Sequence, residues 1–358
     1  MNILHISPNF NYACGVSKHV YLLLKEFKKQ NKHTLFFITN EGDSLGRLND
    51  ICVEPVIVKF KKDNRNLFLF IQFVIKLFLF CKKNKIDIIH THHRVPELAA
   101  VIVSFFLRIR TITTIHSFVK GLKSVSFKSD KIIAVSRSVE NYLINEYKVN
   151  RKKITTCYNF IEPFEEINEK KKFLFRKANN INDNDFVFLF LGRINFIKGC
   201  DVLIKAFNKI NLDVRYKLIL IGSYNLNEEY LRMIQNNESI IIKSPMKNIS
   251  VPLFSSDVVI LPSRYDLFPF FMLEAGMAKK PFIGGRTGGI AEIIEDGVDG
   301  LLVEPGNEND LLEKMMLLVN DGKFREKLAY NLYNKVQKLP TANEYINFIE
   351  KIYAETIN

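Results

Sequence analysis

The chain has 358 residues, of which 47% are hydrophobic and 25% are charged, and a formal net charge of +13. This length suits two domains, and the composition excludes a disordered or low-complexity chain. The first residues lack the features of a signal peptide, and no run of about 18 uncharged apolar residues could span a membrane, so we expect a cytoplasmic protein.

The first half alternates short apolar runs with longer stretches typical of helices, a pattern that predicts βαβ units and a parallel sheet. Helices are expected between the strands, for example at Val16–Gln30 and Leu67–Lys83. The predicted strands are Ile3–Ile6, Leu35–Thr39, Val56–Phe60, Ile86–His90, Thr111–Ile115, Lys131–Val135 and Ile154–Cys157.

The expected helix at Leu67–Lys83 is apolar on almost every side, interrupted by Gln72 and Lys76 and closed by Lys82 and Lys83. A helix of this kind is either buried inside a protein or in contact with lipid. Burial between the sheet and neighbouring helices is the plainer interpretation, and an interfacial helix beside a basic surface is the alternative.

The second half restarts the pattern, which predicts a second Rossmann-like, doubly wound parallel sheet. We place the domains at residues 1–162 and 163–340, with the linker at Asn159–Asn168, where an apolar strand gives way to Glu and Pro. A last helix within 341–358 either completes the second domain or returns to pack on the first. The strands predicted in the second half are Phe186–Leu191, Lys217–Ile221, Ile240–Lys243, Val258–Leu261, Pro281–Ile283 and Leu301–Val303.

The loop from Gly192 to Gly199 follows the first strand of the second half and leads into a helix. Ligands of doubly wound sheets bind beyond the carboxyl ends of the strands, and a loop that opens a helix offers free N–H groups to an anion. Arg193 adds a planar fork for phosphate oxygens, and Lys198 adds a mobile point charge. This loop therefore suits a diphosphate.

A second loop, Pro262–Pro269, follows a later strand and leads into another helix. We expect Pro269 at the first helical position, so that the backbone amides of Phe270 and Phe271 face a ligand. Asp266 in the loop and Glu274 in the helix bring two carboxylates near the helix start. These carboxylates can hold sugar hydroxyls, Glu274 those of a ribose and Asp266 those of a transferred sugar.

Glycine-rich or histidine-bearing loops follow three further strands. Gly284–Glu292 contains four glycines in six positions, including Gly289, which would let the backbone approach a ligand closely. In the first half, Gly15 follows the first strand and opens a helix, where it could admit a phosphate or an acceptor. His116 follows the strand Thr111–Ile115 and is expected to point into the cleft between the domains.

The run His90-Thr91-His92-His93 resembles a metal site, because histidines two apart on a strand share a face. No carboxylate or cysteine at an obvious spacing completes such a site. We therefore expect a hydrogen-bonded wall and no metal.

All the excess positive charge lies in the first half, since residues 1–165 carry 26 Lys and Arg against 13 Asp and Glu. This asymmetry indicates an anionic surface or acceptor that meets the first half only. A genome bias toward Lys, Asn, Ile and Phe is the alternative, although such a bias should not spare the second half. No nucleic-acid-binding module is recognisable, so we expect no nucleic acid partner.

The five cysteines are scattered, and no pair has the spacing of a zinc site or a redox motif, so we predict reduced thiols. Cys14 lies in a glycine loop, but the surrounding sequence implies no histidine partner that would make it a nucleophile.

At these residues the chain resembles the retaining family 4 glycosyltransferases, whose GT-B fold has two Rossmann-like domains that face an interdomain cleft. The resemblance covers nearly the whole chain and is strongest from Phe186 to Pro305. The family's glycine, arginine, lysine and glycine pattern matches Gly192, Arg193, Lys198 and Gly199, and its pattern of two glutamates separated by seven residues falls on Asp266 and Glu274. The first of these glutamates is thus an aspartate here. Weaker matches are Gly15, His19, His116, Ser136, Asn159, Gly289, Ile290 and Glu292.

The resemblance implies transfer of a hexose from a nucleotide diphosphate sugar with retention at the anomeric carbon, through electrostatic stabilisation of the leaving diphosphate by Arg193 and Lys198. It implies that Glu274 binds the ribose, that Asp266 contacts the transferred sugar, and that His116 approaches this sugar. No metal is required, because two cations neutralise the diphosphate.

The basic first domain is expected to bind a glycan or lipid-linked acceptor of cell-envelope polysaccharide or lipopolysaccharide synthesis, peripherally on the inner face of the membrane. The alternatives are a nucleotide-sugar epimerase of the same fold and a nucleotide-sugar-binding subunit without turnover.

Overall fold

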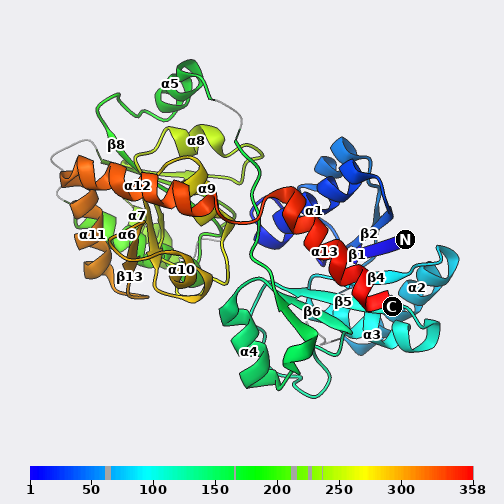
Figure 1. Ribbon diagram of the computed structural model, residues 1–358. Helices are drawn as coiled ribbons and strands as arrows, with labels where there is room; N and C mark the ends of the chain where they lie inside the picture. The colour runs from blue at the N-terminus through cyan, green and yellow to red at the C-terminus, as the bar shows by residue number, and fades with distance from the viewer. Residues whose placement is uncertain (61–65, 165–166, 211–215, 225–227, 236, 358) are drawn as a thin grey trace. The chain divides into compact units, whose positions relative to one another are not determined.

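The computed structural model describes residues 1–60, 66–164, 167–210, 216–224, 228–235 and 237–357 (Figure 1). Contacts divide the chain into two compact units, Met1–Phe160 with Pro340–Asn358 and Ile161–Leu339. The sequence had placed the boundaries after residues 162 and 340. Residues 165–166 of the expected linker lie outside the described residues.

The first unit contains a sheet of seven parallel strands in the order β3-β2-β1-β4-β5-β6-β7, counted over its described residues. Every strand predicted in the first half is present, within three residues at either end. Their bounds are β1 Asn2–Ile6, β2 Thr34–Thr39, β3 Pro55–Ile57, β4 Ile88–Thr91, β5 Arg110–Ile115, β6 Lys131–Ala134 and β7 Ile154–Thr156. Almost all residues of β1, β4 and β5 are buried, because helices cover both faces of a parallel sheet.

Helices connect these strands, and several begin at a side chain that caps the first turn. The Asn66 side chain accepts a hydrogen bond from the amide of Leu69, and the Ser136 hydroxyl accepts one from the amide of Val139, so each satisfies an orphan helical N–H. The helices are α1 Gly15–Gln30, α2 Leu67–Lys83, α3 Arg94–Leu107, α4 Arg137–Tyr147 and α13 Ala342–Ile357, with 3₁₀ turns at Leu45–Ile51 and Arg151–Lys153.

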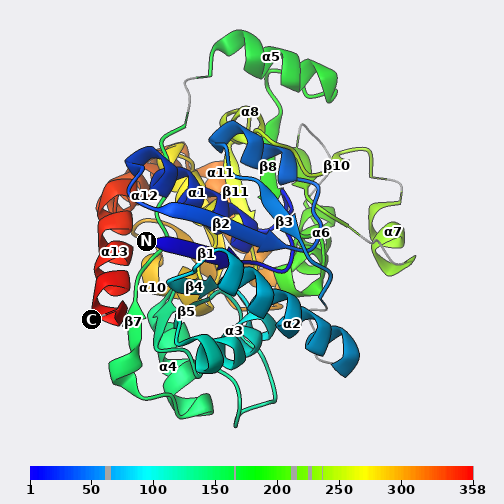
Figure 2. The same ribbon diagram turned by 90° about the vertical axis from the view of Figure 1, so that its right-hand side faces the viewer.

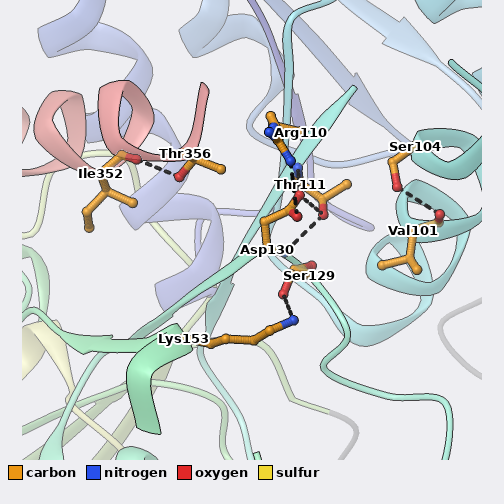
Figure 3. Close-up of polar contacts among 9 residues, drawn as sticks. All are labelled: Val101, Ser104, Arg110, Thr111, Ser129, Asp130, Lys153, Ile352 and Thr356. Atoms are coloured by element: carbon orange, nitrogen blue, oxygen red, sulfur yellow. Dashed lines mark hydrogen bonds and ion pairs between the residues drawn. The ribbon is translucent and has the colours of Figure 1, made fainter. Parts of the chain in front are cut away.

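The neighbouring starts of β5 and β6 are joined by side chains (Figure 3). The Asp130 carboxylate accepts hydrogen bonds from the amide and the hydroxyl of Thr111 at 2.8 and 3.0 Å, and Arg110 lies 3.9 Å from it. Lys153 donates to the carbonyl of Ser129 at 3.3 Å. These contacts fix the end of the sheet opposite the carboxyl ends of the strands.

The last helix, α13, packs on the first unit, which is one of the two positions the sequence allowed. Lys32 of the turn after α1 pairs with Glu350 at 3.1 Å. Tyr345 and Tyr353 are fully buried among residues of the same unit. The C-terminal segment is therefore part of the core of the first unit.

The second unit contains a sheet of six parallel strands in the order β10-β9-β8-β11-β12-β13, again over its described residues. All six predicted strands are confirmed, at β8 Phe186–Leu191, β9 Tyr216–Ile221, β10 Ile240–Lys243, β11 Val258–Leu261, β12 Phe282–Gly285 and β13 Leu301–Val303. The helices are α5 Glu169–Ala178, α6 Cys200–Asn208, α7 Glu228–Ile234, α8 Ser250–Phe254, α9 Phe270–Met277, α10 Gly288–Ile293, α11 Glu308–Asn320 and α12 Gly322–Val336, with a 3₁₀ turn at Phe196–Lys198. Two doubly wound α/β units thus confirm the predicted fold class.

The expectation that the helix at Leu67–Lys83 would be buried is wrong. Only Phe73, Leu77 and Cys81 of α2 are buried, in a core shared with β1, β4 and α3. The opposite face of α2 remains exposed, because α3 covers one side of it and no described element covers the other. Within the described part of the chain, no helix has the length and apolar character needed to cross a bilayer. All five cysteines are free, as predicted.

Candidate active site

The strand order of the second unit reverses between β8 and β11, which is the point where doubly wound sheets bind ligands. The loops that follow β8, β11 and β12 are those in which the sequence placed three motifs. Because these three strands are neighbours in the sheet, the structure brings the motifs together at one edge. The candidate site of the second unit is built from these loops.

Lys198 and Asp266, which come from two of the loops, form an ion pair. The Lys198 ammonium lies 2.5 Å from the Asp266 carboxylate, and the Ser263 hydroxyl donates to the same carboxylate oxygen at 3.3 Å. The side chains retain 18% and 9% of their exposure, so the pair is shielded but reachable. Lys198, which is predicted to bind the diphosphate, and Asp266, which is predicted to contact the sugar, are thus in direct contact.

Arg193 lies in the loop after β8 and is exposed, and its side chain forms no hydrogen bond or ion pair with the described residues. The expectation that this loop offers free backbone amides is wrong for four of them. The amides of Gly192 and Ile194 donate to the carbonyls of Ile221 and Ser223, both at 3.0 Å. The amide of Lys198 donates to the Asn195 side chain at 3.0 Å, and the amide of Gly199 donates to the Phe196 carbonyl at 3.1 Å. An anion at this loop would therefore contact side chains more than amides.

Glycines from the other loops surround the backbone of Pro262–Phe268. A Cβ on Gly199 would lie 2.0 Å from the Pro262 carbonyl oxygen, one on Gly285 would lie 2.1 Å from that of Ser263, and one on Gly289 would lie 2.0 Å from that of Leu267. Gly288, at φ +47°, would place a Cβ 1.9 Å from the Asp266 carbonyl oxygen. The sequence predicts that the glycines of Gly284–Glu292 approach a ligand. In the structure they approach the loop that carries Asp266, and they lock it in place.

The helix α9 begins one residue later than expected, since Pro269 is its N-cap and Phe270 its first helical residue. The side chain of Pro269 forms no capping hydrogen bond. The side chains of Phe270 and Phe271 are buried, and Glu274 is 2% exposed. Glu274 therefore lies inside α9 on its covered face, and it is not a surface glutamate.

The structure reveals a bidentate pair that the sequence did not predict. Arg264 donates to both carboxylate oxygens of Asp201, at 2.7 and 2.8 Å, and to the Phe196 carbonyl at 2.7 Å. Its guanidinium also lies over the Phe196 ring, 3.7 Å from the centroid. The pair ties the loop after β11 to the loop and helix after β8. The two partners are 63 positions apart in the chain, so no local pattern signals them.

In the first unit, five histidines gather near the carboxyl ends of β1, β4 and β5. His5 and His90 are neighbours in the β1–β4 register, His92 and His116 follow β4 and β5, and His19 lies on α1. Three of them form a chain in which His5 Nδ1 lies 3.3 Å from His92 Nε2 and His92 Nδ1 lies 3.3 Å from His116 Nε2. We call these five residues the histidine cluster.

Other buried side chains complete this cluster, and among them the sequence had singled out Asn159 alone. The Tyr353 hydroxyl and the Thr114 hydroxyl lie 2.7 and 2.8 Å from the two ring nitrogens of His90. His19 Nδ1 lies 3.0 Å from the Asn159 side-chain oxygen, and its Nε2 lies 3.4 Å from the Tyr345 hydroxyl. An amide oxygen only accepts, so His19 carries its proton on Nδ1. The predicted hydrogen-bonded wall is present, and α13 contributes to it.

Burial keeps the histidine cluster neutral. It lowers the pKa of His5 to about 3 and that of His19 to about 4, and the pKa values of His90, His92 and His116 are also well below 6.5. Repulsion between neighbouring imidazolium groups adds to the effect of burial for several of them.

Two groups in the histidine cluster have nitrogens within 4.8 Å of one another, His5 with His90 and His92, and His19 with His92 and His116. Neither group includes a carboxylate or a thiolate, so a divalent cation there would place uncompensated charge in a buried site. Several of these nitrogens already bind each other or a hydroxyl. His93 belongs to neither group and instead caps α3 by accepting from the Val95 amide. These observations favour a hydrogen-bonding role.

His116 is the half-buried member of the cluster, and its Nε2 lies 3.3 Å from His92 Nδ1. Gly15 is exposed at the first position of α1. The loop before it is held by the buried Ser17, whose hydroxyl accepts from the Asn11 amide and donates to the Asn9 carbonyl. The first unit thus presents Gly15 and His116 on loops at the same edge of one sheet.

Comparisons with known proteins agree with this geometry. Residues 171–335 match the family described as glycosyl transferases group 1, and residues 13–163 match glycosyltransferase family 4. An uncharacterised glycosyltransferase of Methanocaldococcus jannaschii, MJ1178, is 28% identical, over 99% of this chain and 98% of its own length.

One further relative and one solved structure of similar fold have more informative names. The N,N'-diacetylbacillosaminyl-diphospho-undecaprenol α-1,3-N-acetylgalactosaminyltransferase of Campylobacter jejuni is 24% identical, over 85% of this chain and 86% of its own. The structure of Anabaena Alr3699/HepE in complex with UDP-glucose superposes with a TM-score of 0.86 at 17% identity, covering 99% of this chain and 100% of that one. This structural likeness supports the fold.

Proposed function

Because the chain belongs to the glycosyltransferases of group 1 and family 4, which have the GT-B fold, we propose that it transfers a hexose from a nucleotide diphosphate sugar to an acceptor hydroxyl with retention of the anomeric configuration. The observation that carries the proposal is the convergence of three loops at the strand-order reversal of the second unit. There a shielded Lys198–Asp266 pair and the exposed Arg193 lie at the same end of the sheet as the first residues of α9.

In the proposed reaction the bond between the sugar and the diphosphate breaks, and negative charge grows on the diphosphate. Arg193 and Lys198 stabilise this charge, with the amides at the start of α9, at Phe270 and Phe271, as further donors. The loop backbone at Gly192 and Gly289 shapes the same region. These groups supply the needed positive charge, so the proposed mechanism requires no metal.

The sugar-binding roles fall to the two carboxylates. Glu274 is proposed to hold the ribose hydroxyls, because a buried carboxylate accepts hydrogen bonds from a diol well. Asp266 is proposed to contact the transferred sugar beside the Lys198 ammonium. The Anabaena protein, a neighbour in fold, was solved with UDP-glucose, which supports a UDP-hexose as the first donor to test.

The acceptor is assigned to the first unit. His116 and Gly15 lie on loops at the carboxyl edge of its sheet, and this part of the chain carries the whole excess of positive charge. The name of the Campylobacter relative describes a diphospho-undecaprenol acceptor. We therefore propose a glycan or lipid-linked acceptor in cell-envelope polysaccharide synthesis, reached at the inner face of the membrane.

A donor screen tests the proposal. Nucleotide sugars that bind the folded protein should raise its melting temperature, and the best donor should then yield a glycosylated product whose anomeric configuration is read by NMR. Stabilisation by no nucleotide sugar would contradict the function. Conversion of the donor alone into an epimer would show the alternative reaction on the same fold.

A further inference from the structure

The helices α2 and α3 of the first unit pack against each other (Figure 2). Both expose many large apolar side chains. Phe105 retains 82% of its exposure, Leu67 70% and Phe68 67%. We call the whole set the α2–α3 apolar surface: Leu67, Phe68, Ile71, Ile75 and Leu79 of α2 with Ile102, Phe105 and Phe106 of α3. Large exposed apolar patches of this kind mark sites of interaction with protein or membrane.

The geometry of α2 shows that this surface is not needed for folding. Leu67, Ile71, Ile75 and Leu79 recur every four residues and therefore follow one another along a single face. The opposite face carries Phe73, Leu77 and Cys81, which are buried in the core of the unit. The fold is satisfied by one face of α2 alone, so the apolar residues of the other face require another explanation.

The exposed charges on α2 and at the end of α3 are positive. Lys76 and Lys83 flank the apolar face of α2, and Lys82 follows it at the end of the helix, all three exposed. Arg108 follows α3 and is also exposed. Within its described bounds α2 contains no acidic residue.

The acidic residue in the first turn of α3 points inward. The Glu97 carboxylate is fully buried and accepts hydrogen bonds from the amides of Phe127, Lys128 and Ser129, at 2.6–3.1 Å. The rim of the α2–α3 apolar surface is therefore positive.

We propose that the α2–α3 apolar surface binds an anionic lipid bilayer, with its apolar side chains in the headgroup and acyl-chain boundary and its lysines on the lipid phosphates. An apolar face with a basic rim is the arrangement that interfacial helices use on anionic lipids. Lys76 and Lys83 have apolar stems long enough to lie along the surface while their ammonium groups reach the phosphates. This inference deepens the proposed function, since it names the surface through which a lipid-linked acceptor would be met.

A second copy of this chain fits the surface less well. In a two-fold dimer the same patch faces itself, which would bring the exposed Lys82, Lys83 and Arg108 of both copies together. Juxtaposed like charges oppose such an interface, whereas lipid phosphates complement them. The charge pattern thus favours the bilayer.

Sedimentation of the full chain with vesicles tests the inference. The protein should pellet with vesicles of phosphatidylglycerol and phosphatidylcholine at low salt, and much less with phosphatidylcholine alone. Replacing Phe105 and Phe106 together by Ser should weaken binding to the mixed vesicles about 10- to 100-fold, since two aromatic side chains no longer leave water. Both side chains are exposed, so the variant is expected to fold, which circular dichroism checks.

The matched control replaces Phe173 and Leu174 together by Ser, on the basic helix α5 of the second unit. These side chains are also about half exposed, at 53% and 52%, and the variant should bind vesicles within about twofold of the parent. Changing Lys82 and Lys83 together to Glu should abolish the preference for the anionic vesicles.

Equal binding by the Phe105/Phe106 variant, or loss of binding in the α5 variant instead, would overturn the inference. So would a lipid-free dimer of the parent, measured by sedimentation velocity, that the Phe105/Phe106 change disperses. Vesicle binding is measured without donor or acceptor, and donor binding by calorimetry is measured without lipid. Failure of the inference and failure of the proposed function are therefore distinguishable.

Discussion

Lowering the pH from 7.5 to 5.5 should destabilise the first unit through its buried histidines. Burial holds the pKa of His5 at about 3 and that of His19 at about 4, and those of His90, His92 and His116 are also well below 6.5. In the unfolded chain these groups titrate near 6.5, so below that pH the unfolded state binds more protons. Stability from neutral histidines is therefore fully present above pH 6.5 and is lost as the pH falls.

The size of this loss follows from the linkage between proton binding and unfolding. Between pH 7.5 and 5.5 each such histidine lowers the free energy of unfolding by about 1.4 kcal/mol, and the five together lower it by about 7 kcal/mol. This is a large fraction of the stability of an ordinary domain. The tyrosines that face the cluster do not oppose the effect, because burial raises the pKa values of Tyr345 and Tyr353 and both stay neutral.

Hydrogen exchange of β1 and β4, followed by mass spectrometry in the full chain at several pH values, measures this loss within the first unit. His5→Phe removes one of the five titrating groups and should reduce the dependence on pH by about a fifth. Thr114→Val removes a hydroxyl partner of His90 and should lower stability without changing that dependence. Stability that stays constant from pH 7.5 to 5.5, or an unchanged dependence in His5→Phe, would refute the reasoning.

Three further predictions concern the second unit. Lys198→Ala should reduce turnover about 10²–10³-fold, the scale for one preorganised stabilising group, and near-normal turnover would exclude the role assigned to this lysine. Glu274→Ala should greatly weaken donor binding in calorimetry, and unchanged affinity would contradict the ribose assignment. Gly289→Ala should displace the loop at Leu267 and abolish donor-induced thermal stabilisation, whereas Gly46→Ala, which has open space for a methyl group, should leave it intact.

The strands were predictable because both sheets are parallel and covered by helices. Runs such as Phe186–Leu191 and Val258–Leu261 are apolar throughout, and the restart of such runs after residue 180 separates two sheets of one kind. The positions of Arg193, Lys198 and Asp266 at the ends of strands followed from the same pattern. The burial of α2 did not follow, because a helix that is apolar all round carries no signal of which face meets the core.

The side-chain pairs of the site could not be predicted, because their partners are far apart in the chain. Arg264 and Asp201 are separated by 63 positions, and His90 and Tyr353 by 263. The role of Gly289 was also beyond reach, since a glycine that admits a ligand and a glycine that admits another loop look the same in a sequence. Only the packing of Leu267 against Gly289 distinguishes the two cases.

This packing gives the aspartate at position 266 its significance. The backbone of Asp266 is locked by Gly288, where a side chain would collide with the Asp266 carbonyl, and its carboxylate is held by Lys198 and Ser263. A loop fixed in this way cannot shift to compensate for a longer or shorter side chain. The methylene that separates aspartate from the glutamate of the family pattern therefore moves the negative charge relative to Lys198 by about one carbon–carbon bond, or about 1.5 Å. In the proposed reaction this displacement acts on the transferred sugar, so position 266 is where a change of side chain should alter the choice of sugar before it alters the fold.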